Sequence, residues 1–353
     1  MRILLVGGGS GGHVTTIIAI AKKLHQNDPH SEITVWTDRK FFAQTRELAH
    51  DELPKDVKIV CIPSGKLRRY ANLNFWYKYF SWYHLTHTHF PNLIDLFRLV
   101  GGFATSLVRL RRLRPDVIFC KGGYVCLPVG LAARLLNLPL VIHDSDTVPG
   151  LTNRILAHFA SAIGTGSPIE NYPDYPRKIT QFVGIPVRVE FAELNMEARY
   201  ETKKDLGLDP AKQLIFVAGG GGGAVVFSEI FREIAPKLID NFKVQVFLLT
   251  GKGKGFVVEK PLAENFIVRD FITDEYPALL NACDIFVTRA GATSMAEAAV
   301  SETATIIVPS PYLAGDHQTK NADIFAKANA AITLKQNKTE DNFDNELADN
   351  IYH

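Results

Sequence analysis

Short runs of β-branched and apolar residues alternate along the chain with stretches whose apolar positions recur at helical spacing. This alternation is typical of parallel α/β architecture. The first series of predicted strands is Ile3–Val6, Ile33–Trp36, Val57–Ile62, Val117–Cys120, Leu140–His143 and Ala162–Gly164. The second series is Leu214–Ala218, Val244–Leu249, Phe266–Val268, Ile285–Thr288 and Thr305–Val308. The pattern therefore predicts two similar α/β halves.

Each half opens with a strand that runs into glycines, "VGGGSGGHV" at positions 6–14 and "VAGGGGGAVVF" at positions 217–227. Apolar residues at helical spacing follow the first run and predict one buried helix face: Val14, Ile17, Ile18, Ala21 and Leu24. We expect the connection between the halves near Phe182–Phe191, after the proline-rich stretch "YPDYPRK".

The length and composition agree with two folded domains. A chain of 353 residues, 46% hydrophobic and 22% charged, is too long for one typical core and predicts domains of roughly 150 to 190 residues. A formal net charge of +2 argues against a general nucleic-acid binder, which usually has a strong basic excess. Four cysteines without a CxxC pair suggest reduced thiols rather than a zinc site or a disulfide framework.

The N-terminal segment and the hydropathy bear on localisation. Met1 and Arg2 lead directly into a strand-like run that is too short for the apolar part of a signal peptide. No stretch of about 18 uncharged apolar residues follows. We therefore expect a protein that is made and kept in the cytosol.

The first glycine loop predicts an anion site. A glycine loop between a strand and a helix exposes backbone N–H groups at the helix N-terminus, where the helix dipole favours negative charge by about 0.3 to 1 kcal/mol. Gly7, Gly9 and Gly12 also fit the GxGxxG pattern, and Asp38 ends the second strand where a ribose-binding acid is sought. A dinucleotide-dependent oxidoreductase is thus one hypothesis. It leaves His13, the second glycine run and the segment around Glu297 unexplained.

Four separated motifs resemble the MurG family, the bacterial transferases that add N-acetylglucosamine to lipid I. They are "GGGSGGHV", "KGGYVCLPVGLAARLLNLPLVIHDSDTVPGLTNRILA", "RAGATSMAEAA" and "DHQTKNA", in matching order and spacing from residue 1 to about 335. The resemblance implies the GT-B fold, two Rossmann-like domains with parallel sheets that face each other across a cleft. It implies an acceptor and membrane-facing domain at 1–186, a UDP-sugar domain at 187–334 and a last segment, 335–353, that returns to the N-terminal domain.

The resemblance also implies a reaction, its partners and a location. The donor is UDP-N-acetylglucosamine, and the acceptor is undecaprenyl-linked lipid I at the cytoplasmic face of the cell membrane. An inverting displacement forms lipid II for peptidoglycan synthesis, and cell-wall synthesis proteins are possible partners. No cofactor or metal is expected, although "DSD" at 144–146 mimics a metal motif of another glycosyltransferase class.

The donor residues come from the C-terminal motifs. By resemblance, Glu297 accepts hydrogen bonds from the uridine ribose, as suits an ionised carboxylate facing a vicinal diol. Alternatively, Ser294 and Glu297 form a capping box of their own helix. Gln318 and Thr319 contact the sugar hydroxyls in the family pattern, or act as plain helix caps. The other donor-site residues that the resemblance implies are Arg188, Gly221, Phe271, Ile272, Arg289, Ala292 and Thr293.

The acceptor residues come from the N-terminal motifs. His13 is a candidate general base for the attacking hydroxyl, because an imidazole takes up a proton near neutral pH. Asp144 matches a family glutamate and is the competing candidate, and a purely structural histidine is the third possibility. The expected acceptor contacts are Ser10, Gly11, Gly12, Gly122, Gly123, Tyr124, Asp146 and Asn153.

The chain departs from the family pattern at two positions. Asp146 replaces an asparagine and adds a negative charge beside a pyrophosphate site, and Gly221 replaces a serine. Loss of one hydroxyl donor costs about 1 to 3 kcal/mol unless other donors replace it. A GT-B transferase for another lipid acceptor and a catalytically silent nucleotide-sugar-binding scaffold therefore stay open.

The stretch "KLRRYANLNFWYKYFSWYHL", residues 66–85, predicts a membrane contact. Its aromatic and basic residues are too many to lie on one buried helix face. Tyrosine and tryptophan favour the lipid headgroup boundary, and lysine and arginine are attracted to anionic lipid. The residues predicted for this patch are Arg68, Arg69, Phe75, Trp76, Tyr79, Phe80 and Trp82.

Overall fold

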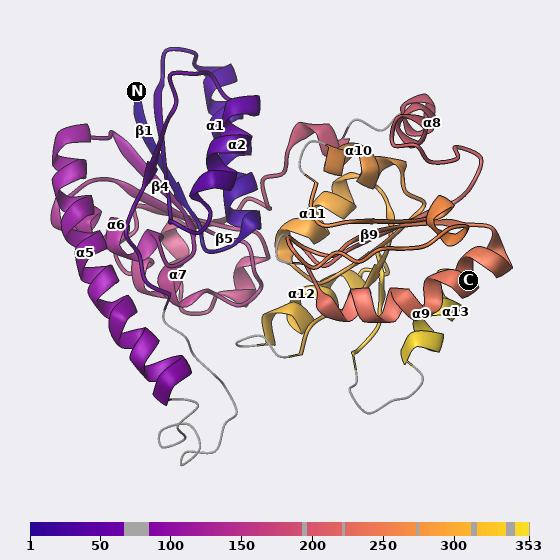
Figure 1. The fold of residues 1–353 in the computed structure, drawn as a ribbon. Helices are drawn as coiled ribbons and strands as arrows, with labels where there is room; N and C mark the ends of the chain where they lie inside the picture. Colours follow the sequence, from indigo (N-terminus) through magenta and orange to yellow (C-terminus); the bar gives the residue numbers. More distant parts are fainter. Residues whose placement is uncertain are drawn as a thin grey trace. The chain divides into compact units, whose positions relative to one another are not determined.

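The computed structural model describes residues 1–66, 85–192, 196–220, 223–272, 275–311, 316–336 and 343–352. The chain divides into two compact units, the first from Met1 to Pro186 and the second from Val187 to His353. Figure 1 shows that each unit is a sheet covered by helices. The expected α/β class with two parallel sheets is confirmed.

The first unit is built on a seven-stranded parallel sheet in the order β3-β2-β1-β4-β5-β6-β7. Its strands are β1 (Arg2–Gly7), β2 (Glu32–Thr37), β3 (Lys58–Cys61), β4 (Val117–Gly122), β5 (Leu140–Asp144), β6 (Ala162–Thr165) and β7 (Thr180–Phe182). Its helices are α1 (Gly11–Asn27), α2 (Phe42–Glu52), a π-helix (Leu85–His89), α5 (Phe90–Leu113), α6 (Cys126–Leu135), α7 (Leu151–Leu156) and two short 3-10 helices (Ile169–Asn171, Arg177–Ile179).

Alternate side chains of β1 point to opposite faces of this sheet, and each face has its own apolar core. Ile3 and Leu5 pack with the buried residues of α1 and α2, whereas Leu4 and Val6 pack with α5 and α6. Because both faces are covered, β1 reads as a continuous apolar run. The sheet order reverses between β1 and β4, so their carboxyl ends form the switch point at which α/β sheets bind ligands.

The second unit repeats this plan with a six-stranded parallel sheet in the order β10-β9-β8-β11-β12-β13. Its strands are β8 (Leu214–Ala218), β9 (Gln245–Leu249), β10 (Phe266–Arg269), β11 (Ile285–Thr288), β12 (Ala304–Ile307) and β13 (Ile332–Thr333). Its helices are α8 (Met196–Asp205), α9 (Val225–Phe242), α10 (Glu275–Ala282), α11 (Ala292–Val300), α12 (His317–Lys327), α13 (Phe343–Tyr352) and two short 3-10 helices (Val189–Ala192, Leu262–Glu264). Here the switch point lies between β8 and β11.

The C-terminal helix corrects one expectation. The last segment, 335–353, was expected to return to the N-terminal domain, but α13 packs against α9 within the second unit. Phe343, Leu347 and Ile351 recur at helical spacing and enter the apolar core beside β8 and β9. Burial of these three side chains is the physical reason that α13 stays with the second unit.

Candidate functional site

The glycine loop after β1 is held by a buried aspartate. Asp38, directly after β2, accepts a hydrogen bond from the Gly9 backbone N–H at 2.6 Å and another from the Lys40 N–H at 2.8 Å. A Cβ atom at Gly8 would lie only 2.2 Å from the Asp38 carboxylate, so glycine is required there. Asp38 is 1% exposed. Its carboxylate therefore organises the loop, and this use argues against the role of a ribose-binding acid in a dinucleotide site.

A second glycine turn follows β4 and packs against the first. Gly122 and Gly123 have φ angles of +121° and +83°, which favour glycine. A Cβ atom at Gly123 would lie 2.1 Å from the Gly8 carbonyl oxygen, and one at Gly9 would lie 3.2 Å from the Tyr124 ring. Side chains at these positions would force the two turns apart.

His13 stands where the two turns meet. Its Nδ1 lies 2.6 Å from the Gly8 carbonyl oxygen. Because a carbonyl only accepts, Nδ1 carries the proton and Nε2 keeps its lone pair. A Cβ atom at Gly122 would lie 3.5 Å from Nε2, so this nitrogen lies over the second turn. Burial, and then the positive charge of Lys121, lower the pKa of His13 to about 4. The imidazole is therefore neutral at physiological pH and can accept a proton.

Asp144, at the end of β5, is more deeply placed than half-buried His13. It is 5% exposed, and its Oδ2 accepts hydrogen bonds from the Tyr175 hydroxyl at 2.8 Å and from the Gly150 N–H at 3.2 Å. Burial raises its pKa to about 6. Asp144 thus stabilises the turn that follows β5, and the geometry favours His13 as the group that reaches a substrate.

The remaining predicted acceptor residues lie at the same edge of the first sheet. The Ser10 hydroxyl is the N-cap of α1 and accepts from the His13 N–H at 3.4 Å, and Gly11 and Gly12 form the first turn of that helix. Asn153 donates to the His143 carbonyl oxygen at 3.0 Å. The backbone of Asp146 accepts from the Tyr172 hydroxyl at 2.8 Å.

Sequence reasoning missed Lys121, the residue before the second glycine turn. Its side chain is 1% exposed and its Nζ donates to the Ser145 hydroxyl. Burial lowers its pKa to about 8. A lysine inside the apolar strand sequence "VIFCKGG" was the signal that could have found it.

In the second unit, Glu297 does not form a capping box. Helix α11 has Gly291 as its N-cap and no side-chain cap, which places Glu297 in the second turn. Glu297 is 8% exposed, and burial raises the pKa of its carboxyl group to about 8 against the opposing effect of the Arg188 charge. The capping alternative is therefore wrong.

Arg188 and Tyr276 complete the surroundings of Glu297. Arg188 is 9% exposed and its guanidinium lies 5.4 Å from the centre of the Phe191 ring. Burial, and then the Glu297 charge, raise the pKa of Tyr276, whose hydroxyl hydrogen-bonds with the Ser294 side chain. Ala292, Thr293 and Ser294 form the first turn of α11 and are half-buried. The group offers a carboxyl, a guanidinium and hydroxyls beside a helix N-terminus, which suits a nucleotide.

Three further predicted donor residues form hydrogen bonds within the second unit. Arg289 donates to the Val308 carbonyl oxygen at 3.0 Å and to Gln336 Oε1 at 2.8 Å. Gln318 accepts from the Ser310 N–H at 2.8 Å. Thr319 donates to Asp316 Oδ1 at 2.6 Å, a contact between two side chains, and Asp316, the N-cap of α12, makes no side-chain cap hydrogen bond.

The predicted uracil contacts follow β10. Lys252 Nζ lies 4.8 Å from the centre of the Phe271 ring, and Ile272 packs against the core beside α10. Gly221 lies outside the described residues, as does the whole predicted membrane patch from Arg68 to Trp82. Within the described ranges, no group of three histidine, cysteine, aspartate or glutamate side chains could hold a metal ion.

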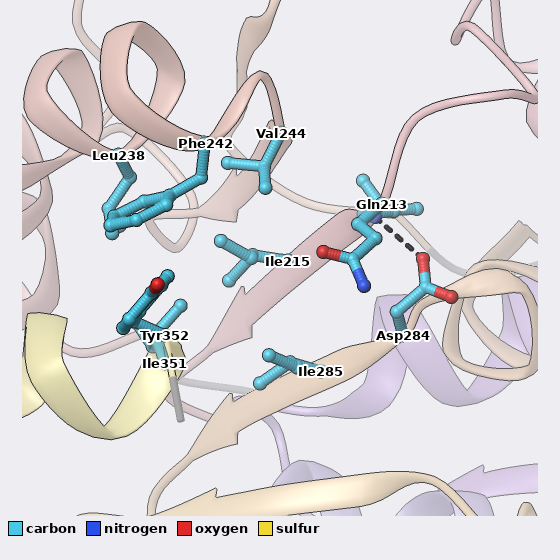
Figure 2. Close-up of a pocket in the computed structure, with 10 residues that line it drawn as sticks. Gln213, Ile215, Leu238, Phe242, Val244, Asp284, Ile285, Ile351 and Tyr352 are labelled. Carbon is cyan, nitrogen blue, oxygen red and sulfur yellow. Dashed lines mark hydrogen bonds between the residues drawn. The ribbon is translucent and has the colours of Figure 1, made fainter.

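A separate cavity of about 200 Å³ lies in the second unit, at the amino ends of β8 and β11. Figure 2 shows its apolar lining around Ile215, Leu238 and Ile285, with Asp284 at one end. Asp284 accepts a hydrogen bond from the Leu214 N–H at 2.7 Å. These residues lie at the amino ends of β8 and β11, whereas α/β sheets bind substrates at the carboxyl ends. The cavity is therefore not a candidate for the reaction site.

Comparisons with known proteins cover both units. Residues 3–165 match the glycosyltransferase family 28 N-terminal domain, and residues 214–352 match the glycosyltransferase family 28 C-terminal domain. A relative from Prochlorococcus marinus (strain NATL1A) is 30% identical over 354 residues, 99% of this chain and 90% of the relative. One from Bacillus pumilus (strain SAFR-032) is 29% identical over 345 residues, 96% and 86% of the two chains. Both are named UDP-N-acetylglucosamine--N-acetylmuramyl-(pentapeptide) pyrophosphoryl-undecaprenol N-acetylglucosamine transferase.

Solved structures agree on the fold. Acinetobacter baumannii MurG matches with a TM-score of 0.64 and 22% identity, over 100% of this chain and 90% of the other. The glycotransferase of kitacinnamycin matches with a TM-score of 0.67 and 16% identity, over 99% and 89%. The expected GT-B fold is confirmed by these likenesses.

The raised pKa of Glu297 predicts a pH-dependent effect of Glu297→Gln on stability. Below the ordinary pKa of 4.5 the carboxyl is protonated in both the folded and the unfolded chain. As the pH rises from about 5 to about 8, only the folded state retains the proton, so the wild type loses stability that the glutamine variant keeps. In thermal unfolding, Glu297→Gln should melt at a higher temperature than the wild type, and the difference between the two melting temperatures should grow as the pH rises over this range. Glu275→Gln, at an exposed position, is the control; a constant difference for Glu297→Gln contradicts the assignment.

Proposed function

This chain belongs to the MurG family of N-acetylglucosamine transferases, and on that premise we propose that it transfers N-acetylglucosamine from UDP-N-acetylglucosamine to the C4 hydroxyl of undecaprenyl-linked lipid I. The product is lipid II, the disaccharide precursor of peptidoglycan. The observation that carries this proposal is a match to the named transferases over 99% of the chain, which includes both glycine-loop sites. A partial match would support only a nucleotide-sugar-binding scaffold.

The donor is held in the second unit. Donor binding ionises Glu297 in this scheme, because two ribose hydroxyls add to the Arg188 charge and together favour the carboxylate over the neutral acid that burial favours. The Glu297 carboxylate then accepts hydrogen bonds from both ribose hydroxyls of uridine, since it has enough lone pairs for both donors. Arg188, beside it, supplies positive charge to the diphosphate. Phe271 and Ile272 contact the uracil, and Gln318 and Thr319 the sugar hydroxyls. No cofactor or metal is required in this scheme.

The acceptor is held in the first unit. Backbone N–H groups of the turn at Gly122 and Gly123 and of the α1 N-terminus receive its diphosphate. His13 Nε2 takes the proton of the C4 hydroxyl as that oxygen attacks the anomeric carbon of the donor sugar. The bond from this carbon to the diphosphate breaks, and UDP leaves with its electron pair. The bound diphosphate raises the pKa of the nearby imidazole, which offsets the effect of Lys121.

A lipid-linked acceptor requires the enzyme to work at the membrane surface, and α5 offers a suitable face. Several large apolar side chains at helical spacing on α5 are exposed: Phe90, Leu93, Phe97, Val100 and Val108. Exposed Arg111 and Arg112 follow in its last turn. Apolar groups with basic neighbours suit an interfacial site on anionic lipid. No helix in the described part of the chain is long and apolar enough to cross a membrane.

The proposed reaction is tested by release of UDP from UDP-N-acetylglucosamine with purified lipid I as acceptor. UDP-glucose, UDP-galactose and a different polyprenyl-diphosphate sugar serve as comparison substrates. Turnover that requires both UDP-N-acetylglucosamine and lipid I supports the proposal. Turnover with the other lipid acceptor alone supports a related transferase, and binding without turnover supports the scaffold.

His13→Ala should lower turnover by about 100- to 10,000-fold and leave donor affinity nearly unchanged, because a general base acts only on the chemical step. Steady-state kinetics and calorimetry measure the two quantities. His25→Ala, in the last turn of the same helix, is the matched control. Asp144→Asn should instead lower the melting temperature, since Asp144 holds Tyr175 and Gly150. Near-normal turnover in folded His13→Ala would remove His13 from the mechanism.

Glu297→Ala should weaken UDP-N-acetylglucosamine binding by about 1.5 to 3 kcal/mol, because an ionised acceptor for two hydroxyls is lost. Calorimetric titration with the donor measures this change. Glu275→Ala, at an exposed site on α10, is the control. Unchanged donor binding would rule out the ribose contact.

The protein should sediment with liposomes that contain anionic lipid, and high salt should weaken this binding because screening removes the basic contribution. Trp76→Ala with Phe80→Ala, and separately Phe97→Ala on α5, should reduce the bound fraction. Val257→Ala, at a residue that is 90% exposed in the second unit, should not. Equal binding to neutral and anionic liposomes would contradict the electrostatic contribution.

A further inference from the structure

Lys121 is a buried cation at the carboxyl end of β4, directly before the second glycine turn. Strand β4 pairs with β5 up to Cys120, which lies opposite Ile142, and against β1 Lys121 is the extra residue between the pairs Val6–Cys120 and Gly7–Gly122. Its Nζ donates to the Ser145 hydroxyl, in the turn that leaves β5. The side chain therefore joins the two strand ends beneath the predicted acceptor site.

Two carboxylates flank Ser145 and interact with this ammonium group. Asp144 and Asp146 both stabilise the charged form of Lys121. Asp144 already accepts from the Tyr175 hydroxyl and the Gly150 N–H. Asp146 also interacts electrostatically with His13, so its charge acts at the position where an acceptor would bind.

An uncompensated Asp146 carboxylate would oppose an anionic acceptor. Lys121 is 1% exposed, and burying an unpaired charge is costly. Its ammonium group therefore needs a nearby carboxylate such as Asp146 as much as Asp146 needs the ammonium group. The same burial keeps Lys121 away from solvent, which argues against a lysine that binds phosphate as an open surface charge.

We propose that Lys121 is a positioning residue of the acceptor site, whose ammonium group holds the 144–146 turn through Ser145 and balances the Asp146 charge so that a diphosphate can approach the glycine turns. This inference rests on the proposed function, because it assumes an anionic lipid-linked acceptor. Lys121 acts through the turn and through its charge, not by contact with the reacting atoms.

A double-mutant cycle tests the balance of charges. Lys121→Met, Asp146→Asn and the double variant are compared with the wild type at saturating UDP-N-acetylglucosamine while lipid I is varied. Lys121→Met should raise the KM for lipid I about tenfold, the scale of one unbalanced unit charge about 12 Å away at an effective dielectric of about 20. The KM for the donor should stay within about twofold, because the donor is held elsewhere. Adding Asp146→Asn to Lys121→Met should bring the lipid I KM back towards the wild-type value.

Inorganic pyrophosphate gives a measurement that needs no turnover. With UDP at saturation to occupy the donor site, calorimetry at constant ionic strength should show that Lys121→Met weakens pyrophosphate binding about tenfold and that the double variant restores it. A loss that persists in the double variant would overturn the charge balance and indicate direct phosphate contact. If the wild type does not use lipid I but this cycle holds, the proposed function fails and the anion-site inference stands.

Asp146→Asn alone keeps the test decisive if Lys121→Met does not fold. With Lys121 intact, loss of the Asp146 charge should tighten pyrophosphate binding by about three- to tenfold. Unchanged or weaker binding in this variant would overturn the inference. Asp174→Asn, at an exposed carboxylate of the same unit, is the matched control.

Discussion

The first unit depends on the close approach of two backbone turns at Gly8. Its carbonyl oxygen accepts from His13 and lies where a side chain on Gly123 would be, while the Asp38 carboxylate occupies the space that a side chain on Gly8 would need. The turns that follow β1, β2 and β4, which are neighbours in the sheet, are thereby held in contact with one another. The tautomer of His13 and the direction of its Nε2 both follow from the bond to the Gly8 carbonyl oxygen. Glycine is therefore a packing requirement here as well as a conformational one.

The second unit also contains a buried acidic residue, but its surroundings differ from those of Asp38. In the first unit Asp38 is satisfied by backbone N–H groups, so its carboxylate serves the fold. Glu297 is also buried, but the Arg188 charge opposes only part of the effect of burial on its pKa. In the proposed function, the ribose hydroxyls of the donor supply the hydrogen-bond donors that this incompletely compensated carboxyl group lacks. The contrast distinguishes a carboxylate that the fold itself uses, Asp38, from one that is a candidate for binding, Glu297.

The sequence predicted the long features and missed those that depend on tertiary contact. Apolar runs such as Leu214–Ala218 are strands because both faces are buried, and periodicity detects that. The edge strands β7 and β13, of three and two residues, are too short to carry a pattern. Local spacing suggested a capping box at Ser294, but the helix starts earlier, at Ala292. Asp38 and Lys121 acquire their roles from residues distant in sequence, which no local motif reports.

The docking of α13 has a consequence for how the chain folds during synthesis. The first unit has all its strands once residue 186 has been made, so it can fold while the ribosome is still at work. The second unit lacks part of its core until Phe343, Leu347 and Ile351 emerge, well after its glycine loop and Glu297. In the interval, the part of the α9 apolar surface that α13 covers is exposed, while the rest packs on the sheet. The second unit is thus the later of the two to complete its core.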